Sequence, residues 1–165
     1  MIRVSKLADY GILLMTWFAW RQARADGVAE RRSATDLAKD TGLPGPTVSK
    51  LLRLLSRADL LDAQRGASGG YALLREPSGI SVADVIEAIE GPIALMDCLD
   101  HSTPECGVES LCPTRTNWDR INQAILQALS AISLEEMATP QTGWRERMSR
   151  SLQAVAPAET TGDPQ

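Results

Sequence analysis

The stretch that most restricts the fold is SATDLAKDTGLPGPTVSKLLRLLSRADLL, residues 33–61. Two helical patterns meet at Gly42; Ser33 suits the N-cap of the first, and Pro46 suits the first turn of the second. The second pattern, residues 46–58, has an apolar side and contains no acidic residue; the apolar side holds Val48, Leu51, Leu52 and Leu55. A tight glycine turn between two helices predicts a helix-turn-helix. An ordinary helical hairpin with a solvated basic face explains the same pattern equally well.

The following residues favour the first alternative. Two short extended runs, 60–65 and 70–74, are joined by the glycine-rich GASGG, which is typical of a β-hairpin. A hairpin directly after a helix-turn-helix makes a winged helix, and Arg65 at its edge is suited to reach a phosphate or the minor groove. We expect Gly66, Gly69 and Gly70 to supply positive φ angles in the turn, with or without a bound nucleic acid.

Three further helices are predicted, so the fold class is mainly α, a winged helix-turn-helix with a small wing. Residues 5–24 form an apolar helix capped by Ser5, and Ser81 opens a helix that stops at Gly91. Residues 114–133 carry two apolar stripes, which indicates a long C-terminal dimerisation helix; packing within one chain is the alternative. We divide the chain into a winged-helix domain (1–80), a cysteine loop with the dimerisation helix (81–138) and a largely disordered tail (139–165).

Charge is distributed unevenly along the chain. Residues 1–80 carry 12 Lys/Arg against 8 Asp/Glu, and residues 81–165 carry 5 against 13. A basic half can bind a polyanion although the formal net charge of the whole chain is -4. The apolar run GILLMTWFAW is too short to span a membrane, and Asp9 and Arg21 argue against a signal peptide. The expected location is the cytoplasm.

All three cysteines and the only histidine lie within DCLDHSTPECGVESLC, residues 97–112. A disulfide leaves one thiol unpaired and requires an oxidising compartment, so it is disfavoured. Zinc fits the donor set of Cys98, His101, Cys106 and Cys112, although only the first spacing is tight. An iron-sulfur cluster accepts three widely spaced cysteines with one other ligand. No nucleophile-base set or phosphate-binding glycine motif indicates an enzyme.

The segments LADYGILLM, RGASGGYAL, SVADVIEAIEG and CPTRTNW, together with the helix-turn-helix and in this order, resemble the IscR-like iron-sulfur winged-helix transcription regulators. The resemblance covers about residues 1–138 and is greatest to the regulators of SUF-type iron-sulfur assembly. It implies a cytoplasmic homodimer, a repressor that binds a palindromic promoter operator and senses its own [2Fe-2S] or [4Fe-4S] cluster. By position, the DNA-binding residues would be Pro46, Thr47, Ser49, Lys50, Arg53 and Arg65.

The same resemblance implies that Cys98, Cys106 and Cys112 ligate the cluster. Arg115 stands where IscR-type members have a histidine ligand, so the fourth ligand is either Asp9 from the partner subunit or His101. Asp9 also has a structural explanation, since the helix macrodipole favours an acid in the first turn. A zinc- or thiol-dependent regulator responding to redox state or nitric oxide is the alternative function, and a cluster carrier is a more distant one.

Overall fold

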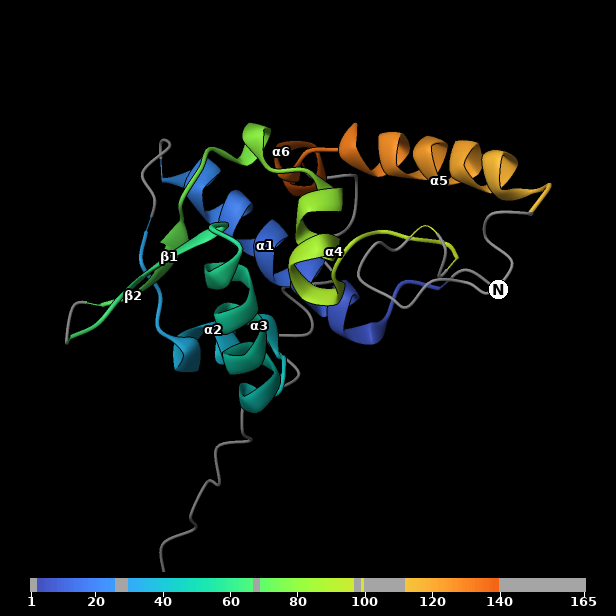
Figure 1. Cartoon of the computed structure of the whole chain (residues 1–165). Helices are drawn as coiled ribbons and strands as arrows, with labels where there is room; N and C mark the ends of the chain where they lie inside the picture. Colours follow the sequence, from blue (N-terminus) through green and yellow to red (C-terminus); the bar gives the residue numbers. More distant parts are fainter. Residues whose placement is uncertain (1–2, 26–29, 67–68, 97–98, 100–111, 140–165) are drawn as a thin grey trace, which may run out of the picture.

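The computed structural model of the chain describes residues 3–25, 30–66, 69–96, 99 and 112–139. In chain order its elements are α1 (Lys6–Arg24), α2 (Ala34–Thr41), α3 (Gly45–Arg57), β1 (Leu61–Gln64), β2 (Gly70–Leu73), the 3-10 turn η1 (Pro77–Gly79), α4 (Val82–Glu90), α5 (Arg115–Ser130) and α6 (Leu134–Ala138). Figure 1 shows α1 at the centre, with the α2–α3 pair, the hairpin and α4 around it. The expected tail beyond Thr139 lies outside the described residues.

The first helix lies at the centre of the hydrophobic core, as its nearly all-round apolar pattern predicts. Ser5 caps α1, its hydroxyl accepting a hydrogen bond from Ala8 N at 3.1 Å. Leu14 and Met15 are fully buried and pack in one cluster with side chains of α2, α3, the hairpin, α4 and α6. No helix among the described residues combines the length and hydropathy that crossing a bilayer would need.

The helix-turn-helix forms as predicted. Ser33 caps α2, and Gly42 ends it in the left-handed conformation at φ 71°, where a side chain would be strained. Pro46 lies in the first turn of α3, where its missing N–H leaves no hydrogen bond unmade. The predicted apolar side of α3 is wholly buried, at 0% exposure for Val48, Leu51, Leu52 and Leu55.

The predicted hairpin is confirmed, with one correction to its glycines. β1 and β2 pair antiparallel in the register Leu61↔Leu73 to Gln64↔Gly70. Gly66 and Gly70 have the expected positive φ, at 115° and 142°, but Gly69 does not. Gly69 is needed for space, because an added Cβ would lie 2.3 Å from the carbonyl oxygen of Gln64.

The helix expected over about residues 114–133 is present, but its C-terminal end was predicted three residues too late. α5 ends at Ser130, and the chain turns into the short helix α6, whose Leu134 is fully buried in the core. The reason is local: Ser133 caps α6 in a reciprocal capping box with Glu136, which favours a new helix start over continuation. The carbonyl of Ile132 accepts a hydrogen bond from Val82 N at 2.9 Å, which joins this turn to the start of α4.

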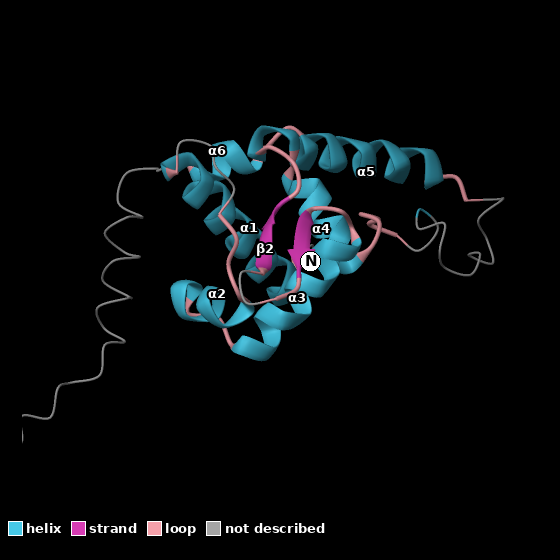
Figure 2. Cartoon of the chain, turned by 90° about the vertical axis from the view of Figure 1, so that its left-hand side faces the viewer, coloured by secondary structure: helices cyan, strands magenta, loops and turns pink. Residues whose placement is uncertain are grey.

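The long helix α5 lies along the edge of the molecule (Figures 1 and 2). Its contact with the body is small: Leu129 packs against a second apolar cluster that includes Ala8, Val82 and Ile86. Asn122 is its only buried residue, and large apolar side chains such as Trp118 and Ile121 are exposed. Within the described residues, the apolar stripes of α5 therefore have few partners.

Candidate nucleic-acid interface

A hollow of about 650 Å³ separates α3 from the β-hairpin, and we call it the α3–hairpin groove. Its lining residues are Pro46, Ser49, Lys50, Arg53, Ser56, Arg57, Ala63, Gln64, Arg65 and Tyr71. The structure thus brings five of the six predicted DNA-binding residues to one surface. The sixth, Thr47, is half-buried on α3 and does not line the groove.

The groove is strongly cationic. Lys50, Arg53 and Arg57 follow one another at helical spacing along α3, and Arg65 faces them from the end of the hairpin. All four side chains are exposed, and none of the described residues that line the groove is acidic. Exposed cations converging on one hollow raise the local concentration of a polyanion and suit its phosphates.

Five lining residues were not predicted as DNA-binding residues from the sequence, namely Ser56, Arg57, Ala63, Gln64 and Tyr71. Arg57 was detectable, because it lies one helical turn beyond Arg53 on the same face. Tyr71 was not, since its position depends on how the hairpin packs against α3. The hydroxyl of Ser56 is buried and has no hydrogen-bond partner among the described residues.

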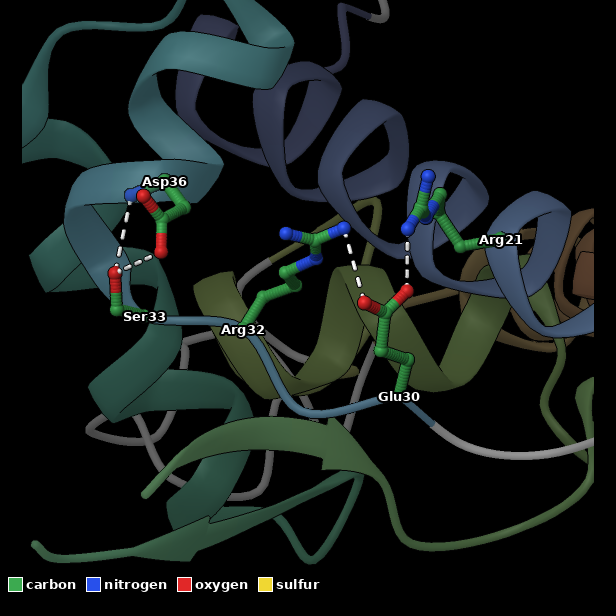
Figure 3. Close-up of polar contacts among 5 residues, drawn as sticks. All are labelled: Arg21, Glu30, Arg32, Ser33 and Asp36. Carbon is green, nitrogen blue, oxygen red and sulfur yellow. Dashed lines mark hydrogen bonds and ion pairs between the residues drawn. The ribbon is translucent and has the colours of Figure 1, made fainter. Parts of the chain in front are cut away.

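The hairpin is attached to the body through the segment before α2. The backbone of Arg32 pairs with that of Tyr71 through two hydrogen bonds, of 3.0 and 2.9 Å, which form an isolated antiparallel bridge beside β2. Glu30 lies between two guanidinium groups, those of Arg21 on α1 and Arg32, the latter at 3.0 Å (Figure 3). The hydrogen bond from Arg21, with the charges of both arginines, lowers the pKa of the Glu30 carboxyl below its ordinary value.

The predicted cluster ligands are only partly within the described residues. Cys98, His101 and Cys106 lie outside them. Cys112 precedes α5 and is half-exposed, and its Sγ lies 3.4 Å from the Thr114 hydroxyl. Hydrogen bonding by Thr114 lowers the pKa of the Cys112 thiol, and thiolate is the form in which cysteine binds metals. Asp9 is exposed in the first turn of α1.

No three His, Cys, Asp or Glu side chains come together within the part of the chain that the structure describes. Cys112 and Asp9 are the two predicted ligands whose positions are known. A solvent-accessible thiol with a lowered pKa and an exposed carboxylate have the chemistry that iron or zinc coordination requires. The chemistry of these two residues fits a metal or cluster ligand role, and the other predicted ligands lie outside the described residues.

A helix-turn-helix followed by a hairpin, with a cationic groove between them, defines a winged-helix DNA-binding protein. The chain belongs to the Rrf2 family, described as an iron-dependent transcriptional regulator, whose sequence model matches residues 4–140. The relatives and structural neighbours whose names state a function include the transcriptional regulators CymR and IscR and a DNA-binding protein, and they are not enzymes. The chain is accordingly a DNA-binding transcriptional regulator of this family.

Two relatives illustrate the similarity in sequence. The regulator CymR of Bacillus subtilis is 29% identical over 145 residues, which is 88% of this chain and 96% of CymR. The regulator IscR of Vibrio atlanticus is 30% identical over 102 residues, 62% of this chain and 58% of IscR.

The solved structures agree with these sequence relations. The structure of CymR, named as the global cysteine regulator of B. subtilis, matches with a TM-score of 0.63 and 29% identity over 84% of this chain and 98% of that one. That of T. potens IscR matches with a TM-score of 0.59 and 27% identity over 88% and 96%. Both likenesses support the mainly helical winged-helix fold.

Proposed function

We propose that this regulator binds double-stranded promoter DNA through the α3–hairpin groove, with α3 in the major groove and Arg65 on the adjacent backbone. The observation that carries the proposal is the convergence of four exposed cations on one hollow, where none of the lining residues within the described ranges is acidic. We expect Lys50 and Arg53 to reach base edges or phosphates, and Pro46, Thr47 and Ser49 lie in the N-terminal part of α3.

A homodimer is part of the proposal, with α5 as the dimerisation helix. Its apolar side chains are unusually exposed in a single chain, at 37% for Trp118 and 45% for Ile121. Ile132, in the turn after α5, is 42% exposed. Burying such a patch against a second copy removes it from water, and a two-fold dimer presents two grooves to DNA. The operator should therefore be roughly palindromic.

We assign the sensing role to an iron-sulfur cluster held by Cys98, Cys106 and Cys112, with Asp9 of the partner subunit or His101 as the fourth ligand. The cluster, [2Fe-2S] or [4Fe-4S], would supply a response to iron, sulfide and oxidants. The protein would then act in the cytoplasm as a repressor of SUF-type iron-sulfur assembly genes. Support comes from the lowered pKa of the accessible Cys112 thiol and from the family's description as iron-dependent.

A second candidate is a zinc- or thiol-dependent regulator of the same fold, responding to redox state or nitric oxide. The similarity to CymR over 88% of this chain favours it, because CymR is named as a cysteine regulator. In this case Cys112 would act as a reactive thiol or a zinc ligand. A cluster carrier that does not bind DNA is the least favoured candidate, because it leaves the cationic groove without a use.

Anaerobic purification followed by iron, sulfide and zinc analysis and Mössbauer spectroscopy distinguishes the cofactors. The cluster proposal requires iron and sulfide in equal amounts and their loss in Cys112→Ala. Stoichiometric zinc without sulfide would support the second candidate. A Cys112→Ala protein that binds its operator with unchanged affinity in every cluster and redox state would exclude a sensing role for this residue.

The DNA-binding proposal is tested by selection of duplexes from a randomised library, followed by titration of the selected duplex. We expect a roughly palindromic consensus and an affinity that falls steeply with salt, because each neutralised phosphate releases counterions. Failure to enrich any sequence, with binding that is insensitive to salt, would reject the groove as a DNA interface.

A further inference from the structure

The hairpin rests on three consecutive residues of the segment before α2. Arg32 pairs with Tyr71 through the backbone, and Gly70 lies directly against it: an added Cβ on Gly70 would be 2.7 Å from the carbonyl oxygen of Arg32. Glu30 forms ion pairs with both Arg32 and Arg21 of α1 (Figure 3). This segment therefore connects the turn end of β2 to the central helix.

Arg31, between these two residues, holds both strands of the hairpin. Its guanidinium forms an ion pair with Asp62 of β1 and donates a hydrogen bond to the carbonyl oxygen of Gly70 in β2, at 3.4 Å. Arg65 follows Asp62 by three residues, immediately after the end of β1. Neither Arg31 nor Asp62 lines the α3–hairpin groove, but Ala63, next to Asp62, does.

We propose that Arg31 and Asp62 are positioning residues for DNA binding, which fix the hairpin so that Arg65 faces the cations of α3. The inference rests on the proposed use of the groove as the DNA interface. The negative charge of Asp62 taken alone would weaken DNA binding, because a carboxylate this close to the groove repels phosphates within the Debye length. Its pairing with Arg31 offsets that repulsion and orders the hairpin before DNA arrives, which lowers the entropy lost on binding.

The opposite signs of the two effects provide the test. If Asp62 acted only through its charge, Asp62→Asn would tighten DNA binding. If it positions the hairpin, the same substitution weakens binding to the selected duplex, by about threefold, because a charge-assisted hydrogen bond becomes a neutral one. Asp59→Asn is the matched control: Asp59 is exposed just before β1, and its φ of 54° suits asparagine. It should leave binding unchanged or slightly tighter.

A double-mutant cycle with Arg65→Ala separates positioning from a direct effect. Because Asp62 is proposed to act through Arg65, Asp62→Asn should cost no further affinity once Arg65 is alanine. The slope of log K against log salt should fall in Asp62→Asn in the same direction as in Arg65→Ala. Tighter binding by Asp62→Asn, or an undiminished loss in the Arg65→Ala background, would overturn the inference.

Thermal melting of each variant verifies that only folded protein is compared. If Asp62→Asn melts early, Arg31→Gln provides the same cycle, with Arg75→Gln as the control that also removes one positive charge beside the hairpin. Arg31→Gln should then lose affinity that Arg75→Gln retains; equal losses would reject the positioning role. Absence of DNA binding by the unmodified protein would instead reject the proposed function, so the two failures are distinguishable.

Discussion

Asn122 binds the backbone of Leu95, across 27 residues of sequence: Leu95 N donates a hydrogen bond to the Asn122 Oδ1 at 3.0 Å. The Nδ2 of the same amide donates to the carbonyl oxygen of Ile93, also at 3.0 Å. Asn122 is 7% exposed and is the only buried residue of α5. The amide is therefore a polar attachment between α5 and the chain that leads into the cysteine segment.

Asn122→Ala should lower the free energy of unfolding by about 2 kcal/mol, because it leaves two backbone groups without partners. Urea denaturation followed by circular dichroism measures the change. Gln123→Ala, at the exposed neighbouring position, is the control and should stay within about 0.5 kcal/mol of the parent. Equal stability of the two variants would mean that water replaces the amide at no cost.

Gly70→Ala should destabilise the protein by about 2 kcal/mol. Its φ of 142° disfavours any side chain, and the new Cβ would meet the Arg32 backbone, which cannot move without breaking its pairing with Tyr71. Gly79→Ala is the control, since nothing lies within 4 Å of a Cβ there. Thermal melting of the pair gives the comparison; similar melting temperatures would contradict the tight packing of the hairpin.

The helix-turn-helix, the hairpin and the helix caps were predictable because each depends on local chemistry. Ser33, Gly42 and Pro46 act within one or two helical turns of their own position. The spacing of the apolar residues along α3 is enough to predict its buried side. The burial of Asn122 was not predictable, because its hydrogen-bond partners lie in a distant segment and a polar residue is expected at the surface.

The attachment of the hairpin was also hidden from the sequence. Arg31 and Asp62 are 31 residues apart, and each alone is an ordinary charged residue. The groove likewise has residues that the sequence could predict and residues that it could not. The cations of α3 follow from helical spacing, whereas Tyr71 joins the groove only through tertiary packing.

Glu30→Gln should make the protein less stable at pH 7 by under about 1 kcal/mol, because the ion pairs it removes are solvent-exposed. The arginines lower the pKa of Glu30 in the folded state below the ordinary 4.5. Its stabilisation is therefore complete above the pKa of the unfolded chain and is lost as the pH falls through the lower folded value. Urea midpoints of the two proteins should differ at pH 7 and converge near the acid limit of folding.

Glu87→Gln, on the exposed side of α4, is the control for this pH series. A difference between Glu30→Gln and the parent that stays constant into acid would show that the carboxylate charge is not its cause.

Ile121→Glu should dissociate the proposed dimer, raising its dissociation constant by at least about tenfold, because a charge would replace an apolar contact at the centre of α5. Its 45% exposure in the single chain means that monomer stability should change little. Sedimentation velocity over a concentration series measures the equilibrium. Gln123→Glu adds the same charge on a neighbouring side of α5; if both variants dissociate equally, net charge rather than the apolar stripe would be responsible.

Lys50→Ala should weaken DNA binding and reduce the salt slope by about 1 if Lys50 contacts a phosphate. If it reads a base edge instead, affinity falls mainly for the selected sequence, and discrimination at one position relaxes. Fluorescence anisotropy at several salt concentrations separates the two. Lys6→Ala is the control, since Lys6 lies over the Tyr10 ring at 5.5 Å, at the start of α1. Equal effects of both variants would show that only total charge matters.

Asn122 of α5 binds the backbone of Leu95, just before the segment 97–112 that holds the cysteines, and Cys112 at the other end of that segment lies three residues before α5 begins. Arg115, where α5 begins, and Asn122 are seven residues apart, which is about 10 Å along a helix axis. Fixing the two flanks of a segment close together reduces the loop-closure entropy that ligand binding would otherwise cost. If the segment binds the proposed cluster or a zinc ion, its affinity should depend on the order of the first two turns of α5, and a variant that frays them should bind the ligand more weakly although every ligating side chain is intact.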